Sequence, residues 1–578
     1  MSTPGDGHDP DGISRRDLLR LGAATAATTA LVGVARSTTA AAASSDLEEL
    51  TVAQIQAAMG RGGLSAQSLV ERYLARIDQI DVRGGLKSII ELNPDAQAIA
   101  KQMDAERKAG RLRGPLHGVP ILLKDNIDTH DRMQTTAGSR ALVGTPPPQD
   151  ATLVKGLRAA GAVILGKTNM SEWANFRSTH STSGWSGRGH QCHNPYALDR
   201  NASGSSSGSG AAVSANLTAV SLGSETDGSI VSPANNNGVI GLKPTVGLVS
   251  RGGVIPISHS QDTVGPHTRT VADAAAVLNA IVARTADPRD PATSVGRNRI
   301  PADYSAFVTS SLRGKRIGIA RDGVTGYSTQ TDAIYEDAIQ AMRDAGAVVL
   351  DPVDVPTIGE INSSPDEFIV LIWEFKDDLN AYLATRTGTL AVGSNKTLAG
   401  LIAFNEADEI ELKYFGQEIF LLAEARDFFG TPITPAMYAA ALENGKARGG
   451  ANGIDKVFAD NNLDALVAPT GHPAWTTDLI NGDHFLGASS SIAAIAGYPI
   501  INVPMGNSFG LPVGISFMGP AFSEPKLIAA ASGFEAATKA RILPQFVQTL
   551  PLEQAVPPRR GKGRKPKRDS NAMRVKHL

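Results

Sequence analysis

Apolar and polar positions are arranged along the chain in blocks that predict strands and helices following one another. Residues 118–124 contain an uninterrupted apolar run that predicts a buried strand, and residues 162–165, enclosed by Gly161 and Gly166, predict another. Between them, residues 151–160 have the spacing of an amphipathic helix. A strand, a helix and a second strand in this order indicate a parallel sheet with crossover helices.

The same pattern extends over most of the chain. Near the start, Thr51 and Gln54 form a capping box for one helix, and a second helix is expected after Ser65. Further apolar runs predict strands near Val220 and at residues 238–242, 315–320, 465–469 and 500–504. We therefore predict an α/β fold in which a large mixed, mostly parallel sheet is sandwiched by helices within one domain, residues 44–550.

Residues 368–451 depart from this alternation. They are helical in pattern and richer in charged and aromatic side chains, as residues 374–379 illustrate. We predict a helical elaboration beside the core of the domain.

The two ends of the chain differ from its body. Arg15 and Arg16 precede a weakly apolar, Ala-rich run that resembles a twin-arginine export signal over residues 1–43, although a charged start to an N-terminal helix is an alternative. We expect export to the periplasm or the cell exterior. The run is too short and too rich in small residues to predict stable membrane insertion. Residues 551–578 form a basic tail predicted to be disordered, which could weakly tether the protein to an anionic surface.

Composition restricts the chemistry. The formal net charge of -2 gives the body of the protein no global attraction to nucleic acid. A single cysteine, Cys192, excludes an intramolecular disulfide framework and a zinc site built on several thiolates. His190 and His193 flank it, but local histidine clusters are more often loop residues, and no further ligand motif accompanies them.

Two motifs match well-known patterns in the wrong context. Gly161, Gly166 and Lys167 fit a phosphate-binding loop, but the four residues between the glycines predict a strand instead of a turn. Gly204, Ser206 and Gly208 fit a nucleophile elbow, which needs an apolar strand before it, whereas a polar loop precedes this one. A flexible Ser/Gly linker is disfavoured because an apolar helix follows at once.

Lys124, Ser205 and Ser229 lie in contexts that suit catalysis. Residues 223–229 form a turn of mostly small residues whose backbone N–H groups can converge on an oxyanion. Lys124 ends an apolar run, where desolvation lowers a lysine pKa and favours the neutral base. Ser-Lys pairs replace Ser-His-Asp in some hydrolases, and a second serine can relay the proton.

Several ordered motifs resemble the amidase signature family, and the likeness extends from about residue 50 to residue 546. They are residues 122–126, 135–139, 204–209, 223–229, 241–245 and 262–266. The resemblance implies that Ser229 is the nucleophile, that Ser205 is a bridging serine in a cis peptide, and that Lys124 is the base. It further implies an oxyanion site formed by the N–H groups of Thr226, Asp227, Gly228 and Ser229. Family members place the bridging serine 24 residues before the nucleophile, which selects Ser205 over Ser206.

Ser203, Ser207 and Asp227 replace glycines that are usual in the family. These departures, with residues 172–178 and 374–382, resemble the bacterial peptide amidases, which hydrolyse C-terminal carboxamides of peptides. The resemblance implies conversion of a carboxamide to a carboxylate and ammonia, with no cofactor or metal. Alternatives are hydrolysis of small, aryl or fatty acyl amides, and a catalytically degenerate exported binding protein. A component of a tRNA-dependent amidotransferase fits poorly with an exported chain.

Overall fold

The computed structural model describes residues 47–551. The predicted signal peptide, residues 1–43, and all but the first residue of the predicted tail, residues 551–578, lie outside this range. Both therefore stay predictions.

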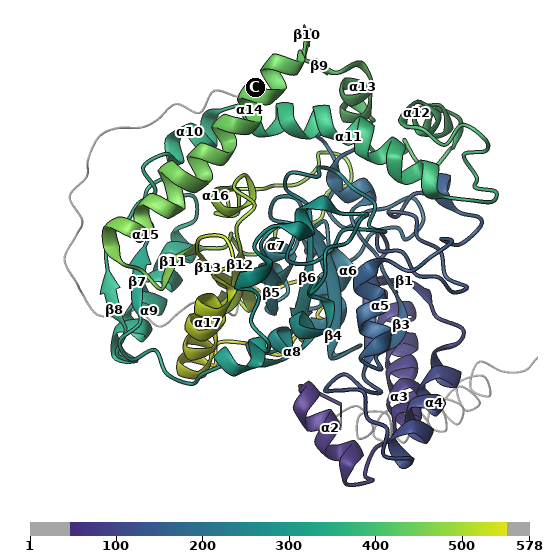
Figure 1. The fold of residues 1–578 in the computed structure, drawn as a ribbon, viewed down its shortest axis with the longest axis horizontal. Coiled ribbons are helices and arrows are strands. Elements are labelled where there is room, and N and C mark those ends of the chain that lie inside the picture. Colours follow the sequence, from purple (N-terminus) through teal and green to yellow (C-terminus); the bar gives the residue numbers. More distant parts are fainter. Residues whose placement is uncertain (1–46, 552–578) are drawn as a thin grey trace, which may run out of the picture.

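One sheet of eleven strands runs through the molecule, in the order β1-β3-β2-β4-β6-β5-β12-β13-β11-β7-β8 (Figure 1). Its strands are β1 (Ile89–Leu92), β2 (Pro120–Lys124), β3 (Val163–Thr168), β4 (Val220–Glu225), β5 (Ile240–Lys243), β6 (Thr263–Thr268), β7 (Arg316–Ile319), β8 (Val348–Leu350), β11 (Ala465–Pro469), β12 (Ile500–Ser508) and β13 (Leu511–Met518). A separate two-stranded hairpin contains β9 (Asp427–Phe428) and β10 (Thr431–Pro432).

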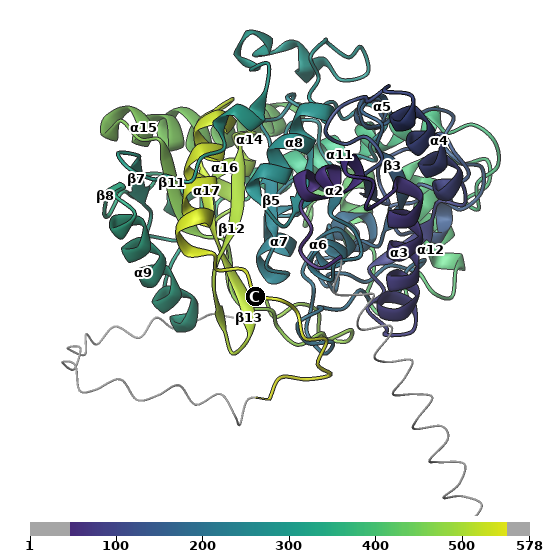
Figure 2. The same cartoon turned by 90° about the horizontal axis from the view of Figure 1, so that it is seen from below.

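The sheet is mixed, as predicted, but parallel pairs do not dominate it. The pairs β2–β3, β2–β4, β11–β7 and β7–β8 are parallel, and the other six neighbouring pairs are antiparallel. The antiparallel strands β12 and β13 are joined directly by a tight turn and lie side by side in Figure 2. A strand buried on both faces reads as a continuous apolar run in either orientation, so the apolar pattern could not distinguish the two kinds of pair.

Helices surround the sheet, and most of those predicted are present. They are α2 (Val52–Gly60), α3 (Ala66–Ile77), α4 (Ala96–Lys108), α5 (Thr152–Ala159), α6 (Ser207–Ser214), α7 (Val231–Asn236), α8 (Val271–Ile281), α9 (Thr329–Asp344), α10 (Ile358–Ser363), α11 (Asp366–Thr385), α12 (Leu398–Ala407), α13 (Glu418–Ala425), α14 (Pro435–Lys446), α15 (Asp455–Asn461), α16 (Ser491–Ala494) and α17 (Glu524–Thr538). The predicted capping box is present at α2, where Thr51 and Gln54 bond reciprocally. None of the helices within residues 47–551 is long and apolar enough to cross a membrane.

The helical elaboration has an apolar core of its own. Its longest helices, α11 and α14, pack against each other and arch over the sheet at the top of Figure 1. Ile372, Phe375 and Phe420 of the elaboration are buried together with Trp173 and Phe176 from the loop after β3. The elaboration is therefore anchored to the loops at one edge of the sheet, which also carry the candidate active site.

Candidate active site

Lys124 ends β2 in the interior of the protein. Its side chain is fully buried, and its Nζ atom donates hydrogen bonds to Ser205 Oγ at 2.8 Å, to Ser224 Oγ at 2.9 Å and to Ser224 O at 3.1 Å. Parallel neighbours on both sides, β3 and β4, fix the strand that carries it. The structure therefore brings two of the predicted site residues, Lys124 and Ser205, into direct contact.

Burial sets the protonation of this lysine. Desolvation lowers the pKa of Lys124 to about 7, although the carboxylates of Asp262 and Glu225 act in the opposite direction. At neutral pH a substantial fraction of the amine is consequently unprotonated. In that form its lone pair can accept a proton from Ser205.

Ser205 lies in a tightly packed loop just before α6. The Gly204–Ser205 peptide bond is cis. A side chain at Gly204 would place its Cβ atom 2.1 Å from Ser171 Oγ, so only glycine fits there. The two unusual serines nearby are both paired: Ser203 Oγ lies 2.8 Å from Ser232 Oγ, and Ser207 Oγ donates to the Ser203 carbonyl at 2.5 Å. The departures from the family pattern thus add hydrogen bonds to this loop.

Ser229 lies in the turn that follows β4. Ser206 N donates to the Ser229 carbonyl at 3.2 Å, which joins this turn to the loop that contains Ser205. Ser229 is half-buried, and its hydroxyl makes no hydrogen bond with residues 47–551. Hydrogen bonds of catalytic groups are often loose in an empty site and tighten when substrate binds. The hydroxyl is therefore placed beside Ser205 and is free to react.

The predicted oxyanion residues surround that serine. Gly228 has a φ of +74°, the left-handed conformation that favours glycine and turns successive N–H groups to one side. The N–H groups of Asp227, Gly228 and Ser229 donate to no acceptor in the described part of the chain. Such N–H groups are available to a developing oxyanion.

Asp262 supports this turn from behind. Thr226 Oγ1 donates to Asp262 Oδ1 at 2.6 Å, while the N–H groups of Ile257 and Ser258 donate to Asp262 Oδ2 at 2.8 and 3.0 Å. Burial raises the pKa of Asp262 to about 6. Our sequence reasoning gave this residue no role, although it begins one of the family-like motifs, residues 262–266.

A cleft of about 600 Å³ opens beside the turn. Its lining includes backbone and side chains from the predicted site, at Gly204, Asp227 and Gly228. The opposite wall comes from distant segments and contains the aromatic residues Tyr327, Trp475 and Phe485. No motif marked these residues in the sequence. The arrangement can hold a partly apolar substrate with its reacting end against the turn.

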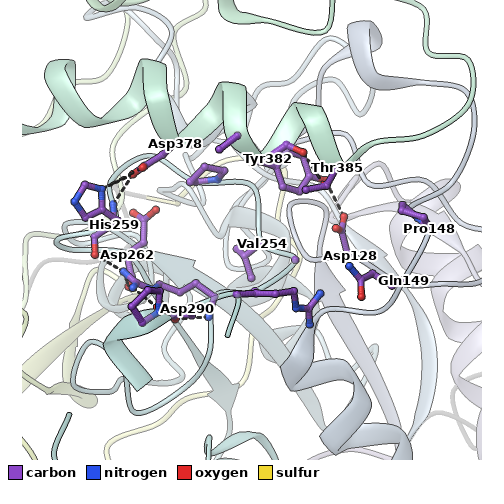
Figure 3. Close-up of a pocket in the computed structure, with 17 residues that line it drawn as sticks. Asp128, Pro148, Gln149, Val254, His259, Asp262, Asp290, Asp378, Tyr382 and Thr385 are labelled. Atoms are coloured by element: carbon purple, nitrogen blue, oxygen red, sulfur yellow. Dashed lines mark hydrogen bonds and ion pairs between the residues drawn. The ribbon is translucent and has the colours of Figure 1, made fainter. Parts of the chain in front are cut away.

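A second cavity, of about 450 Å³, lies between the loop at residues 251–262 and α11 (Figure 3). Asp262 belongs to its wall, so it contacts both this cavity and the oxyanion turn. In Figure 3 His259 faces Asp378, with 2.9 Å between Nδ1 and Oδ2. With Glu374 these two residues form a cluster of potential metal ligands. Hydrogen bonds from Ser258, Ser260 and Tyr438 already occupy both Glu374 oxygens, so we assign no ion to it.

The motifs set aside in the sequence analysis have structural roles in the fold. Lys167 lies on β3, within a strand and not in a phosphate-binding turn. Ser206 Oγ donates to the Ser224 carbonyl at 3.1 Å and is fully buried. His193 Nδ1 lies 2.7 Å from the Leu198 carbonyl oxygen, and Cys192 is buried as a free thiol.

Comparison with known proteins agrees with this geometry. The family model named Amidase matches residues 68–528. The chain belongs to the amidase family. A probable amidase of Arabidopsis thaliana is 45% identical over 510 residues, which cover 87% of this chain and 92% of the relative. A chain of the glutamyl-tRNA(Gln) amidotransferase of Chloroflexus aurantiacus is 35% identical and aligns with 86% of this chain and 98% of its own length.

Solved amidase structures share the fold. The native peptide amidase from Stenotrophomonas maltophilia superposes with a TM-score of 0.79 at 50% identity, covering 86% of this chain and 99% of that structure. An amidase family protein from Bacillus anthracis superposes with a TM-score of 0.76 at 33% identity, over 87% and 93% of the two chains. The predicted family and the large mixed sheet with helices are thereby confirmed. The protein is an amidase, a hydrolase of amide bonds.

Proposed function

We propose that this amidase hydrolyses the C-terminal carboxamide of peptides to a carboxylate and ammonia, through an acyl-enzyme formed on Ser229. The observation that carries the proposal is the 2.8 Å hydrogen bond from the buried Lys124 amine to Ser205, in the loop joined to the Ser229 turn. The 50% identity to a peptide amidase supports the choice of substrate class. The partly apolar cleft also has room for the end of a peptide.

The first half of the reaction forms the acyl-enzyme. Ser229 Oγ attacks the carbonyl carbon while its proton passes to Ser205, and the Ser205 proton passes to neutral Lys124. The N–H groups of the turn stabilise the oxyanion of the tetrahedral intermediate, each contributing about 3 kcal/mol. When the C–N bond breaks, the proton returns along the same path to the leaving nitrogen, which departs as ammonia.

The second half restores the enzyme. A water molecule replaces the nitrogen in the cleft and gives up a proton through Ser205 to Lys124 as it attacks the ester carbonyl. Collapse of the second tetrahedral intermediate breaks the bond to Ser229 Oγ and releases the peptide acid. No cofactor or metal takes part in this scheme.

Mass spectrometry of the products tests both the mechanism and the substrate. Peptides that end in a carboxamide should gain 1 Da as ammonia leaves, whereas internal peptide bonds should stay intact. A fluorophosphonate probe should label Ser229 and leave the buried Ser206 unmodified. Hydrolysis that survives in Ser229→Ala, or labelling at Ser206, would contradict the assignment of the nucleophile. Ammonia release from small, aryl or fatty acyl amides alone would leave the amidase but remove the peptide substrate.

We also propose that residues 1–43 direct export by the twin-arginine route. Replacing Arg15 and Arg16 by lysine should leave the enzyme in the cytoplasm, while the unchanged chain appears outside it with an N-terminus near Ser44. Cell fractionation and N-terminal sequencing measure this. Equal export of both proteins would refute the proposal.

The basic tail is proposed to tether the exported enzyme weakly to an anionic surface. Deleting residues 552–578 should then reduce binding to vesicles that contain anionic lipid, and added salt should do the same to the full chain. Sedimentation with the vesicles measures the bound fraction. Binding that is unchanged by the deletion would assign no such role to the tail.

A further inference from the structure

Asp227 offers more to the site than its backbone N–H group. Its carboxylate lines the cleft beside Gly204 and Gly228, two residues before the proposed nucleophile. Ser491 Oγ donates to Asp227 Oδ2 at 2.5 Å and fixes the side chain, while Asp227 Oδ1 has no hydrogen-bond partner within residues 47–551. An ionised carboxylate is an acceptor for several hydrogen bonds, so this one retains capacity for a donor.

The charge of the cleft has one sign. Asp227 and Asp483 both line it, and none of its lining residues is a lysine, an arginine or a histidine. Asp483 is engaged elsewhere, because Ser183 N and Trp475 Nε1 donate to it at 3.0 and 3.1 Å. Asp227 is therefore the carboxylate that lies nearest in sequence to the reacting serine and is least satisfied by the protein.

A second acid from the helical elaboration helps to define this charge. The Asp227 charge and burial together raise the pKa of Glu367 to about 8, so Glu367 is mostly neutral at pH 7. Gln261 Nε2 also donates to Glu367 Oε1 at 2.7 Å. Burial raises the pKa of Asp227 too, but hydrogen bonds from Ser490 and Ser491 counteract it. The negative charge shared by the two acids is consequently held at Asp227, on the wall of the cleft.

Substrate and product of the proposed reaction differ at one atom. A carboxamide presents an NH₂ group, a donor of two hydrogen bonds, where the product presents a carboxylate oxygen that is negative and accepts only. A fixed carboxylate next to that position attracts the first and repels the second. Because the family usually has a glycine at this place, as the resemblance above indicates, the acid is an addition of this branch to the common machinery.

We propose that the Asp227 side chain is the specificity-determining group at the leaving-group position, where it accepts an N–H of the carboxamide and repels the carboxylate of the product. The inference rests on the proposed function, because the turn must hold the substrate carbonyl for Asp227 to meet its nitrogen. Two consequences follow. The enzyme favours a carboxamide over an ester of the same peptide, which has no N–H to donate, and the peptide acid binds weakly and leaves readily.

Asp227→Asn tests this with three matched ligands: an N-acetyl dipeptide carboxamide, its methyl ester, and the free dipeptide acid used as an inhibitor. In the purified full chain at pH 7.5, the inhibition constant of the acid should fall by about tenfold or more relative to the KM of the carboxamide. The preference in kcat/KM for the carboxamide over the ester should fall by a similar factor. Both ratios within about twofold of the wild-type values would overturn the proposal.

Two further variants sharpen the result. Asp483→Asn removes the other carboxylate of the cleft and should leave both ratios within about twofold, since its charge is held by Ser183 and Trp475. Equal shifts in Asp483→Asn and Asp227→Asn would show a general effect of cleft charge and would refute the assignment to Asp227. If Asp227→Asn does not fold, Asp227→Gly restores the usual family residue and should show the same two changes.

Failure of this inference can be told apart from failure of the proposed function. If wild-type protein releases no ammonia from the peptide carboxamide, or if Ser229→Ala still does, the proposed function is wrong and this inference falls with it. If the wild type hydrolyses the carboxamide, Ser229→Ala does not, and Asp227→Asn keeps both ratios, only the role of Asp227 is wrong.

Discussion

Two buried lysines on neighbouring strands, Lys124 on β2 and Lys167 on β3, share nearly every property that a sequence can show. Each follows apolar residues in its strand, and in the parallel pairing Leu123 lies opposite Lys167 while Lys124 lies opposite Thr168. Both side chains are fully buried, and desolvation lowers the pKa of both amines. Burial therefore does not distinguish the proposed base from a structural cation.

Their neighbours distinguish them. Lys167 Nζ donates to the Ile127 carbonyl at 2.6 Å and to Thr135 Oγ1 at 2.7 Å, and four carboxylates raise its pKa against the effect of burial: those of Asp125, Asp128, Asp131 and Glu91. Lys124 instead donates to two serine side chains, one of them in the loop that borders the cleft. An amine surrounded by acids is held as a cation, whereas an amine beside hydroxyls can exchange protons.

The largest expected effect comes from removing the amine of Lys124. Lys124→Met should lower kcat for carboxamide hydrolysis by about 10²–10⁴-fold, because proton transfer from Ser205 loses its acceptor. Steady-state kinetics measures the loss, with circular dichroism to show that the variant is folded. A decrease of less than about tenfold would remove the distinction between the two lysines.

Lys167→Met should have its main effect on stability. It leaves Asp125 and Asp128 buried without their cation, at a cost of about 3–5 kcal/mol in the free energy of unfolding. Urea titration measures this. Activity per active site, counted with the fluorophosphonate probe, should stay within about threefold of the wild type. A catalytic loss as large as that of Lys124→Met would mean that both lysines act in the chemistry.

The pH dependence should report Lys124 alone. Because its pKa is lowered to about 7 and the neutral amine is the active form, kcat/KM should rise with pH to a plateau above about pH 8. Below pH 6 it should fall about tenfold per pH unit. A neutral carboxamide substrate does not titrate in this range, so the profile reflects the enzyme. A profile that is flat from pH 5 to 8 would be inconsistent with a lysine base.

The smallest effect is expected for Asp262→Asn. The Asp262 carboxylate raises the pKa of Lys124, so its removal should lower that pKa and move the acid limb of the profile to lower pH. The asparagine oxygen can still accept from Thr226, which limits the damage to the oxyanion turn. An acid limb displaced to higher pH would contradict the sign of this interaction.

The catalytic segments could be predicted from the sequence because they are continuous and rich in signals. The strand before Lys124 is an apolar run, and the Ser205 loop and Ser229 turn are dense in small residues with family-like spacing. The structure brings Lys124 and Ser205 into contact as the resemblance implied. The order of the strands was not accessible, since apolar runs carry no information about their neighbours.

The far wall of the cleft was missed for a physical reason. Tyr327, Trp475 and Phe485 come from loops with no motif, and aromatic residues in loops most often indicate packing alone. Glu367 belongs to a helix whose pattern predicted only its secondary structure. Their proximity to the turn depends on how distant segments fold together, which local spacing does not encode.

That division of the cleft between two parts of the chain matters for protein engineering. All the groups proposed to move protons lie between residues 124 and 229, whereas much of the surface that meets the rest of the substrate lies between residues 323 and 491. A mutational library confined to the second segment can therefore explore new acyl groups while the reaction centre stays intact. The same separation would let a lineage change its diet of amides by altering loops that take no part in bond breaking.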